Sequence, residues 1–216
     1  IKYVNGENEV DVAGLKKEDK DFNNASFNFD NGRFECIREQ EKMSKSKFNV
    51  VNPDEICDQY GADTLRMYEM FLGPIEQSKP WDTRGISGVY SFLKRFWNLF
   101  FEGDKLTLTE DMPSEESLKS LHKTIKKVTE DIEKLSLNTC ISSFMICVNE
   151  LSSLKCNNRL ILEQLLVLIS PFAPHFAEEL WNQIGNVKSI IDEKYPEFDK
   201  KYLIESEKNY PVSFNG

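Results

Sequence analysis

The amino-acid sequence predicts a mainly α protein, in which a short segment of strands and loops precedes an α-helical bundle. Hydrophobic residues make up 40% of the 216 residues, which is enough to bury a core. Up to about residue 40, apolar and polar side chains alternate between turn signals, as they do in short strands. After Asp82 the apolar side chains recur three and four positions apart, which is typical of amphipathic helices.

The strands near the N-terminus are predicted from two turn signals. Residues 1–4 alternate before Asn5-Gly6, and residues 27–29 alternate before Asn31-Gly32. Asn-Gly favours the tight turns that join antiparallel strands. We therefore expect short strands and loops in this part of the chain.

Helix starts and stops organise the rest. Asn52-Pro53-Asp54-Glu55 combines a capping Asn, a Pro suited to the first turn and a Glu three positions after the cap. We expect this helix to end at Gly61 in a left-handed conformation, and Asp63 to cap a second helix that stops at Gly73-Pro74. Further helices, together forming an up-and-down bundle, are expected over residues 82–100, 114–135, 138–154, 158–169 and 174–184, with linkers over residues 103–114 and beyond residue 185.

The composition excludes several classes of protein. The chain carries 36 acidic and 27 basic side chains, a net charge of -9, so any nucleic-acid contact must use a local basic patch. Five cysteines without C-x-x-C spacing fit a reducing cytoplasm better than a disulfide framework or a zinc site. Neither a signal peptide nor a membrane-spanning apolar run is present, so we expect a cytoplasmic protein that makes no membrane contact.

The segment Lys42-Met43-Ser44-Lys45-Ser46 carries the chemistry. Its lysines and that at position 47 are interleaved with hydroxyls, in a stretch without helical or strand periodicity. Ammonium groups on a mobile loop can follow phosphate oxygens as charge builds on a leaving pyrophosphate, and hydroxyls add hydrogen bonds. The alternative is a solvated basic turn.

This pentamer is similar to the second signature of class I aminoacyl-tRNA synthetases, and the likeness continues through residues 47–54 and 60–66. Residues 70–81 resemble the leucine-specific family. Residues 168–181 resemble the final helices of the anticodon-binding domain shared by this subclass. The resemblance covers nearly everything from residue 41 to about residue 184.

The resemblance implies that the loop binds ATP and stabilises the transition state in which leucine attacks the α-phosphate. It places Lys42 and Lys45 in catalysis and Lys42, Ser44, Lys45 and Ser46 against ATP, with Met43 as a packing anchor. Many members have Gly where this chain has Phe48, so the resting shape of the loop is expected to differ. ATP, with Mg²⁺ in the parent enzyme, leucine and tRNA(Leu) are the implied cofactors and partners, and no metal site is expected in this chain.

The same resemblance implies the domain organisation. Residues 1–52 would end a catalytic domain, residues 53–80 would connect, residues 81–185 would form the anticodon-binding bundle, and residues 186–216 would be a linker and the start of a truncated β segment. Alternation of Tyr210, Val212 and Phe214 before Asn215-Gly216 predicts the strand of that segment.

The family's His-x-Gly-His signature is absent, because His122 and His175 are the only histidines. We therefore expect a fragment of a leucine–tRNA ligase that is inactive alone and works with the remaining catalytic and editing domains. The alternatives are a non-catalytic helical tRNA-binding module or a protein-interaction module derived from such an enzyme.

Three further features have a plain and a functional interpretation. His175 with Glu178 and Glu179 could bind a metal, but we favour a histidine held by local hydrogen bonds at a helix start. The aromatic stripe from Phe92 to Phe100 is expected in the core rather than as a base-stacking platform. Two basic clusters could contact phosphates, and i,i+4 pairing is expected to neutralise much of the first. These clusters are Lys123, Lys126 and Lys127, and Lys94 and Arg95.

Overall fold

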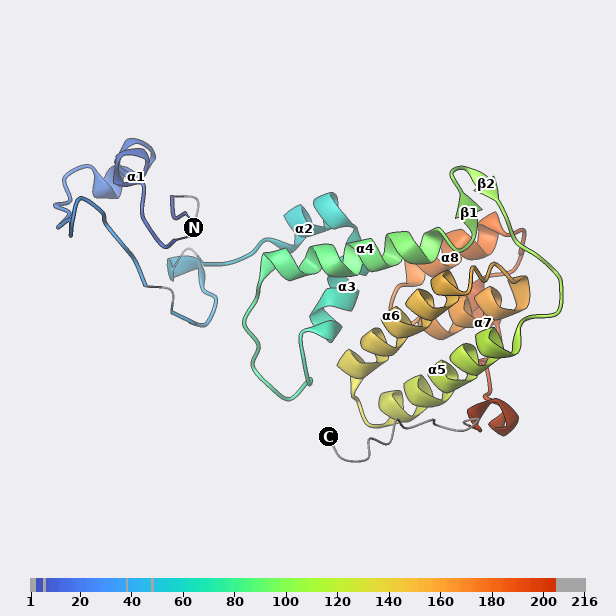
Figure 1. Cartoon of the computed structure of the whole chain (residues 1–216). Helices are drawn as coiled ribbons and strands as arrows, with labels where there is room; N and C mark the ends of the chain where they lie inside the picture. The colour runs from blue at the N-terminus through green and yellow to red at the C-terminus, as the bar shows by residue number, and fades with distance from the viewer. Residues whose placement is uncertain (1–2, 6, 38, 48, 205–216) are drawn as a thin grey trace, which may run out of the picture. The chain divides into compact units, whose positions relative to one another are not determined.

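A computed structural model describes residues 3–5, 7–37, 39–47 and 49–204 (Figure 1). The chain divides into two compact units, Ile1–Val51 and Asn52–Gly216. The predictions for residues 1 and 2, Gly6, Phe48 and the strand at residues 210–214 lie outside the described residues.

The first unit contains a helix that the sequence did not lead us to expect. Helix α1, Val12–Glu18, is capped by Asp11, whose carboxylate accepts a hydrogen bond from the Gly14 N–H at 2.9 Å. A side-chain cap is worth about 1 kcal/mol, which helps a seven-residue helix form. The prediction of strands and loops alone was therefore wrong for this stretch.

The rest of the first unit is extended chain joined by isolated antiparallel bridges. Bridges pair Val4 with Val10, Glu9 with Glu35, and Asp30 with Arg33. The predicted turn at Asn31-Gly32 is confirmed, because both residues have positive φ and Asp30 and Arg33 exchange two backbone hydrogen bonds of 2.9 Å. Short 3₁₀ turns occur at Lys20–Phe22 and Lys45–Lys47.

The second unit is α-helical, as predicted. The predicted cap at Asn52 is confirmed, since its side chain accepts a hydrogen bond from the first turn of α2. The side chains of Ser114 and Asn158 cap α5 and α7 in the same way, at the expected starts of those helices. Gly61 has φ +87 and ends α2, also as expected. The helices are α2 Pro53–Tyr60, α3 Ala62–Phe71, α4 Ile86–Trp97, α5 Glu115–Glu133, α6 Leu137–Ser153, α7 Arg159–Ile169 and α8 Pro174–Gln183.

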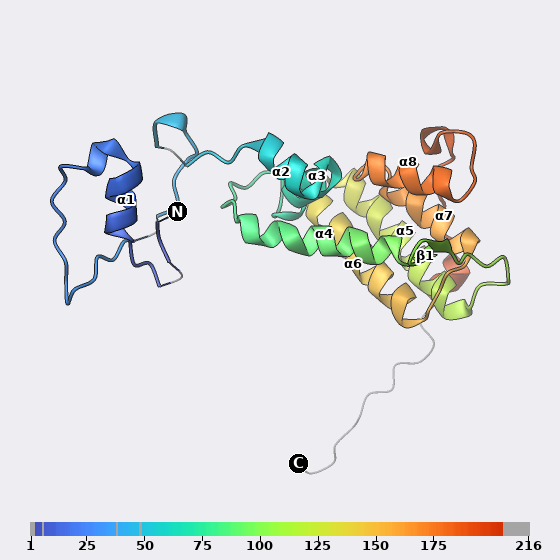
Figure 2. The ribbon, with the colours of Figure 1, turned by 90° about the horizontal axis from the view of Figure 1, so that it is seen from above.

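The helices pack around one apolar core. Helix α5 runs beside α6, α3 packs on α4, α6 and α8, and α7 packs on α5 and α8 (Figures 1 and 2). Phe92, Phe96 and Phe100 are completely buried, and Phe96 lies 5.6 Å from the Phe176 ring of α8. The expectation that the aromatic stripe belongs to the core is confirmed for these three rings, whereas Trp97 of the same stripe is only partly buried. Removing one such ring would cost about 3–5 kcal/mol.

A small hairpin occupies part of the stretch that was predicted to be a linker. Strand β1, Phe101–Glu102, pairs antiparallel with β2, Lys105–Leu106. Gly103, with φ +61, makes the tight turn between them. The Phe101 ring stacks on Trp97 of α4 with centroids 5.1 Å apart, so the hairpin is fixed to the end of that helix.

The chain after α8 is anchored on α5 through His122. The backbone N–H of Asp199 donates to His122 Nδ1 at 3.2 Å, and the imidazole stacks on the Tyr202 ring at 4.7 Å. Burial lowers the pKa of His122 below its ordinary value, while Asp199 raises this pKa and Lys201 lowers it. The folded state therefore holds His122 neutral, with Nδ1 as an acceptor.

This arrangement predicts a pH dependence of stability. The folded chain binds fewer protons at His122 than the unfolded chain, so the free energy of unfolding should rise with pH. The contribution of His122 to this free energy should be lost progressively as the pH falls below the ordinary histidine pKa of about 6.5. His122→Phe keeps a ring against Tyr202 but cannot accept the hydrogen bond, and should be about 1 kcal/mol less stable than wild type at pH 7.5. Urea unfolding of wild type and of His122→Phe at pH 7.5 and 5.5 measures the free energy of unfolding of each protein. The difference in stability between the two proteins should be smaller at pH 5.5 than at pH 7.5. A gap that widens in acid would contradict the neutral histidine.

Candidate functional site

The lysine loop of the first unit is a compact turn. Lys45–Lys47 form a single 3₁₀ turn, which closes through a hydrogen bond of 3.1 Å from the Lys47 N–H to the Ser44 carbonyl. The Ser44 and Ser46 hydroxyl oxygens lie 3.0 Å apart. The turn therefore brings the two hydroxyls of the pentamer together.

Asn49 holds this turn closed from outside the pentamer. Its side-chain oxygen accepts a hydrogen bond from the Ser44 N–H at 2.8 Å, and its side-chain nitrogen donates to the Lys42 carbonyl at 3.3 Å. The Asn49 amide thus binds the backbone groups of the two residues that flank Met43. The sequence analysis did not single out Asn49, because an Asn after a basic turn has many possible local partners.

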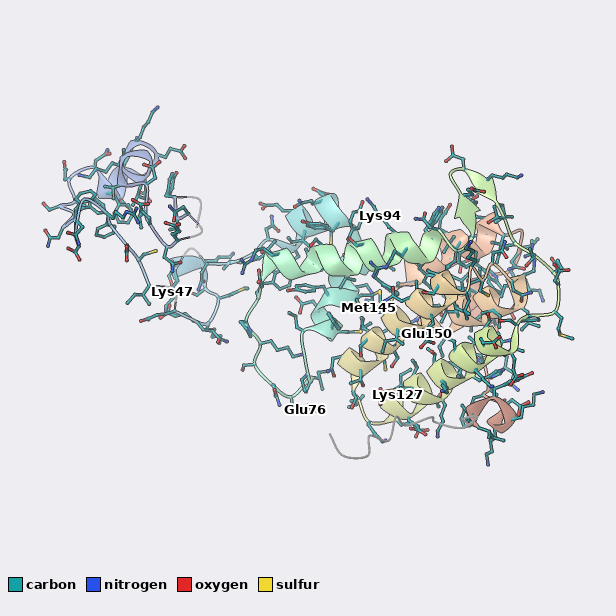
Figure 3. The ribbon with its side chains drawn as sticks, viewed as in Figure 1. Lys47, Glu76, Lys94, Lys127, Met145 and Glu150 are labelled. Atoms are coloured by element: carbon teal, nitrogen blue, oxygen red, sulfur yellow. The ribbon has the colours of Figure 1, made fainter. Side chains whose placement is uncertain are left out.

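The three lysines of the loop differ in their electrostatic surroundings. Lys47 pairs with Glu41, and its side chain is labelled on the loop in Figure 3. Lys42 and Lys45 are exposed, and no carboxylate in the described part of the chain lies within ion-pair distance of either. Their ammonium groups are the ones available to an added anion. Met43, expected to be a packing anchor, is 42% exposed within this unit.

In the helical unit, Asp63 caps a different helix from the one predicted. Its buried carboxylate accepts a hydrogen bond from the Phe176 N–H at 2.6 Å and contacts His175 Nδ1 at 2.9 Å, both at the start of α8. Helix α3 begins at Gly61 without a side-chain cap, so the prediction that Asp63 caps its own helix was wrong. Asp63 lies inside the first turn of α3, which directs its carboxylate toward α8 instead.

The same contact determines the role of His175. Glu178 accepts from the Ser189 hydroxyl and the Ile190 N–H, at 2.9 and 3.0 Å, and Glu179 accepts from Gln183 at 2.8 Å. Both carboxylates are thus engaged in hydrogen bonds on α8 and on the turn that follows it. No group of three or more His, Cys, Asp or Glu side chains among the described residues is placed to hold a metal ion. His175 is structural, as favoured, but its partner is distant in the sequence rather than local.

A second contact joins the same two segments. The Arg66 guanidinium donates to the Pro171 carbonyl at 3.1 Å. Arg66 and Asp63 belong to the segment 60–66, and Pro171 and His175 belong to the segment 168–181. The structure therefore brings together two segments that the sequence analysis singled out separately.

The two basic clusters of the helical unit are also unequal. On α5, Lys126 pairs with Glu130 at 3.9 Å and Lys127 pairs with Asp131 at 2.6 Å. The predicted i,i+4 neutralisation is thus confirmed for these two lysines. On α4, Lys94 lies 4.3 Å from the centre of the Tyr90 ring, and neither Lys94 nor Arg95 has an ion pair within the described ranges.

None of the helices in the described part of the chain is both long and apolar enough to span a membrane.

Comparison with known proteins finds a family match in each of these two regions. A family described as "tRNA synthetases class I (I, L, M and V)" matches residues 36–81, which include the lysine loop. A family described as "Anticodon-binding domain of tRNA ligase" matches residues 115–215. The two matches assign part of a catalytic domain and an anticodon-binding domain to this chain.

Individual relatives agree with these families. The chain is 60% identical to a leucine–tRNA ligase of Christiangramia forsetii over 100% of its own length, and 61% identical to one of Flavobacterium psychrophilum over 97%. It spans 22% of the length of each. A LeuRS of Agrobacterium radiobacter K84, whose structure was solved with tRNA and LeuAMS, matches 76% of this chain at 29% identity with a TM-score of 0.64, and the match covers 23% of that LeuRS chain.

The Asp63 contact makes a testable prediction about stability. Asp63→Ala leaves the first turn of α8 without its side-chain acceptor, and should lower the free energy of unfolding by about 2 kcal/mol in urea, measured by far-UV circular dichroism. Asp58→Ala removes an exposed carboxylate from α2 and should change the free energy of unfolding by less than about 0.5 kcal/mol. Equal losses in the two variants would show that the α3–α8 contact contributes nothing specific.

Proposed function

We propose that this chain, which belongs to the leucine–tRNA ligase family of class I aminoacyl-tRNA synthetases, supplies the lysine-loop half of an ATP site and a helical tRNA-binding domain to a larger enzyme. The observation that carries the proposal is the state of the loop. Lys42 and Lys45 are exposed and without ion pairs among the described residues, while Asn49 fixes the turn that presents them. The closure by Asn49 holds these cations in one defined turn, which supports a binding role for them.

In the proposed reaction the leucine carboxylate attacks the α-phosphorus of ATP. A phosphorus–oxygen bond forms to leucine, the bond to the β-phosphate oxygen breaks, and leucyl-adenylate and pyrophosphate result. Negative charge grows on the departing pyrophosphate, and Lys45 and Lys42 stabilise it as it grows. The Ser44 and Ser46 hydroxyls donate hydrogen bonds to phosphate oxygens. Leucine is then transferred to tRNA(Leu) held by the helical unit.

Several parts of this reaction need residues that this chain lacks. The His-x-Gly-His signature is absent from its sequence, so the chain alone should not form leucyl-adenylate. Mg²⁺, which the family resemblance implies with ATP, finds no suitable cluster among the described residues, and no step above depends on it. The remaining catalytic residues belong to the other parts of the parent ligase, which also include any editing domain.

The role of Lys45 is tested by ATP–pyrophosphate exchange. In the full-length parent ligase, Lys45→Ala should slow leucine-dependent exchange by about 100-fold or more, which is the effect of removing one preorganised transition-state contact. Binding of tRNA(Leu) should be unchanged. Lys47→Ala is the matched control, because that lysine is already paired with Glu41 and its loss should slow exchange far less. An unchanged exchange rate in Lys45→Ala would rule out the proposed role.

The role of Asn49 is tested separately. Asn49→Ala releases the turn and should slow exchange by about tenfold or more through misplacement of the ammonium groups. Asn52→Ala removes the cap of α2 three positions later, and should cost about 1 kcal/mol of stability while leaving exchange within about twofold of wild type. If both variants lose activity in proportion to stability, Asn49 acts only through folding.

A further inference from the structure

Helix α4 has a charge pattern that no other described α-helix shares. Its twelve residues include Lys94 and Arg95 but neither Asp nor Glu. Every other α-helix of the described residues that contains Lys or Arg also contains acidic residues. The exposed side of α4 is therefore cationic and otherwise uncharged, in a chain whose net charge is -9. Its exposed residues are Ser87, Gly88, Ser91, Lys94, Arg95 and Asn98, the last of which follows the helix.

The contrast with α5 separates a free basic surface from a neutralised one. Lys119, Lys126 and Lys127 of α5 each have a carboxylate partner one turn away, so an approaching phosphate must compete with that partner. Figure 3 labels Lys94 on α4 and Lys127 on α5. For a polyanion that approaches an acidic protein, the exposed side of α4 is the electrostatically open one.

A cavity adjoins this surface. It has a volume of about 400 Å³, lies between the start of α3, α4 and the start of α8, and has Lys94 in its lining. Its walls also include Tyr60, Tyr90, Trp97 and Phe176. The Lys94 ammonium lies 4.3 Å from the Tyr90 ring centre, and the Tyr90 ring meets Tyr60 edge-on at 5.7 Å. A cation beside an aromatic recess matches the two parts of a nucleotide, a phosphate and a planar base.

We propose that the exposed side of α4 and the cavity beside Lys94 form the surface through which the helical unit contacts tRNA. Lys94 and Arg95 bind backbone phosphates, and one unpaired base packs against the aromatic wall at Tyr90. This inference rests on the proposed function only in that the parent ligase binds tRNA. It assigns the contact to α4 and denies it to the lysines of α5.

The experiment compares two equal charge removals in the full-length ligase. Lys94→Ala with Arg95→Ala should weaken tRNA(Leu) binding about tenfold in a filter assay, because two charge-assisted contacts are lost. The slope of log K against log salt should fall by about two, one per phosphate released. Lys119→Ala with Lys126→Ala removes the same charge from α5, and should leave Kd within about twofold of wild type.

Two further measurements distinguish the base contact and the alternative explanations. Tyr90→Leu should weaken binding while leaving the salt slope unchanged, because a stacking contact releases no counterion. Pyrophosphate exchange and the melting temperature should stay at wild-type values in the Lys94 and Arg95 variant. A lower exchange rate or a lower melting temperature in that variant would overturn the inference. It would show that α4 packs against another part of the ligase, or that its cations stabilise the C-terminal end of their own helix.

The inference can also fail while the proposed function stands. If the Lys94 and Arg95 variant binds tRNA(Leu) with the same Kd and salt slope as wild-type ligase, the α4 assignment is overturned and the proposed function stands. Equal weakening by the α4 and α5 variants would overturn it as well, since it would show a non-specific charge effect. Wild-type ligase that does not bind tRNA(Leu) would overturn the proposed function and this inference together.

Discussion

The buried carboxylate of Asp63 joins α3 to α8 in the helical unit. Asp63 is 7% exposed, and a charge at such a position is tolerated only when hydrogen bonds replace its lost water. The start of α8 supplies them, through the Phe176 N–H and the His175 ring. Because α3 packs on α4 and α6 as well as on α8, this contact fixes the helix that follows α2 to the last helix of the bundle. The cavity beside Lys94 lies where α3, α4 and α8 meet.

Most of the fold could be predicted because its helices begin and end with local signals. Each of three N-cap side chains accepts a hydrogen bond from a backbone N–H two or three positions later, so the cap can be recognised from nearby sequence. These caps are Asn52, Ser114 and Asn158. Asp63 was assigned to the wrong helix because its partner at residue 176 is 113 positions away. The hairpin at Gly103 was missed for another reason, since strands of two residues have no measurable period.

The candidate site divides in the same way. Residue types and spacing predicted that Lys42, Ser44, Lys45 and Ser46 bind phosphate, because ammonium and hydroxyl groups can interact with phosphate oxygens. The geometry that presents them was not predictable. Asn49 binds the backbone N–H of Ser44 and the carbonyl of Lys42, and every residue offers such groups. Pairing of Lys47 with Glu41 is equally a matter of how the turn closes.

One physical condition separates the cations of the loop and of α4 from their paired neighbours. A lysine beside a carboxylate has already exchanged part of its hydration for an ion pair, so a phosphate gains little by approaching it. Lys47 and Lys127 are in that state. Lys45 of the loop and Lys94 of α4 are not, among the residues that the structure describes. An excess of acidic residues therefore does not oppose binding of ATP or RNA uniformly. It neutralises some basic positions, such as Lys47 and Lys127, and leaves others open. On the proposed function, a polyanion would meet the loop and α4 without a competing carboxylate.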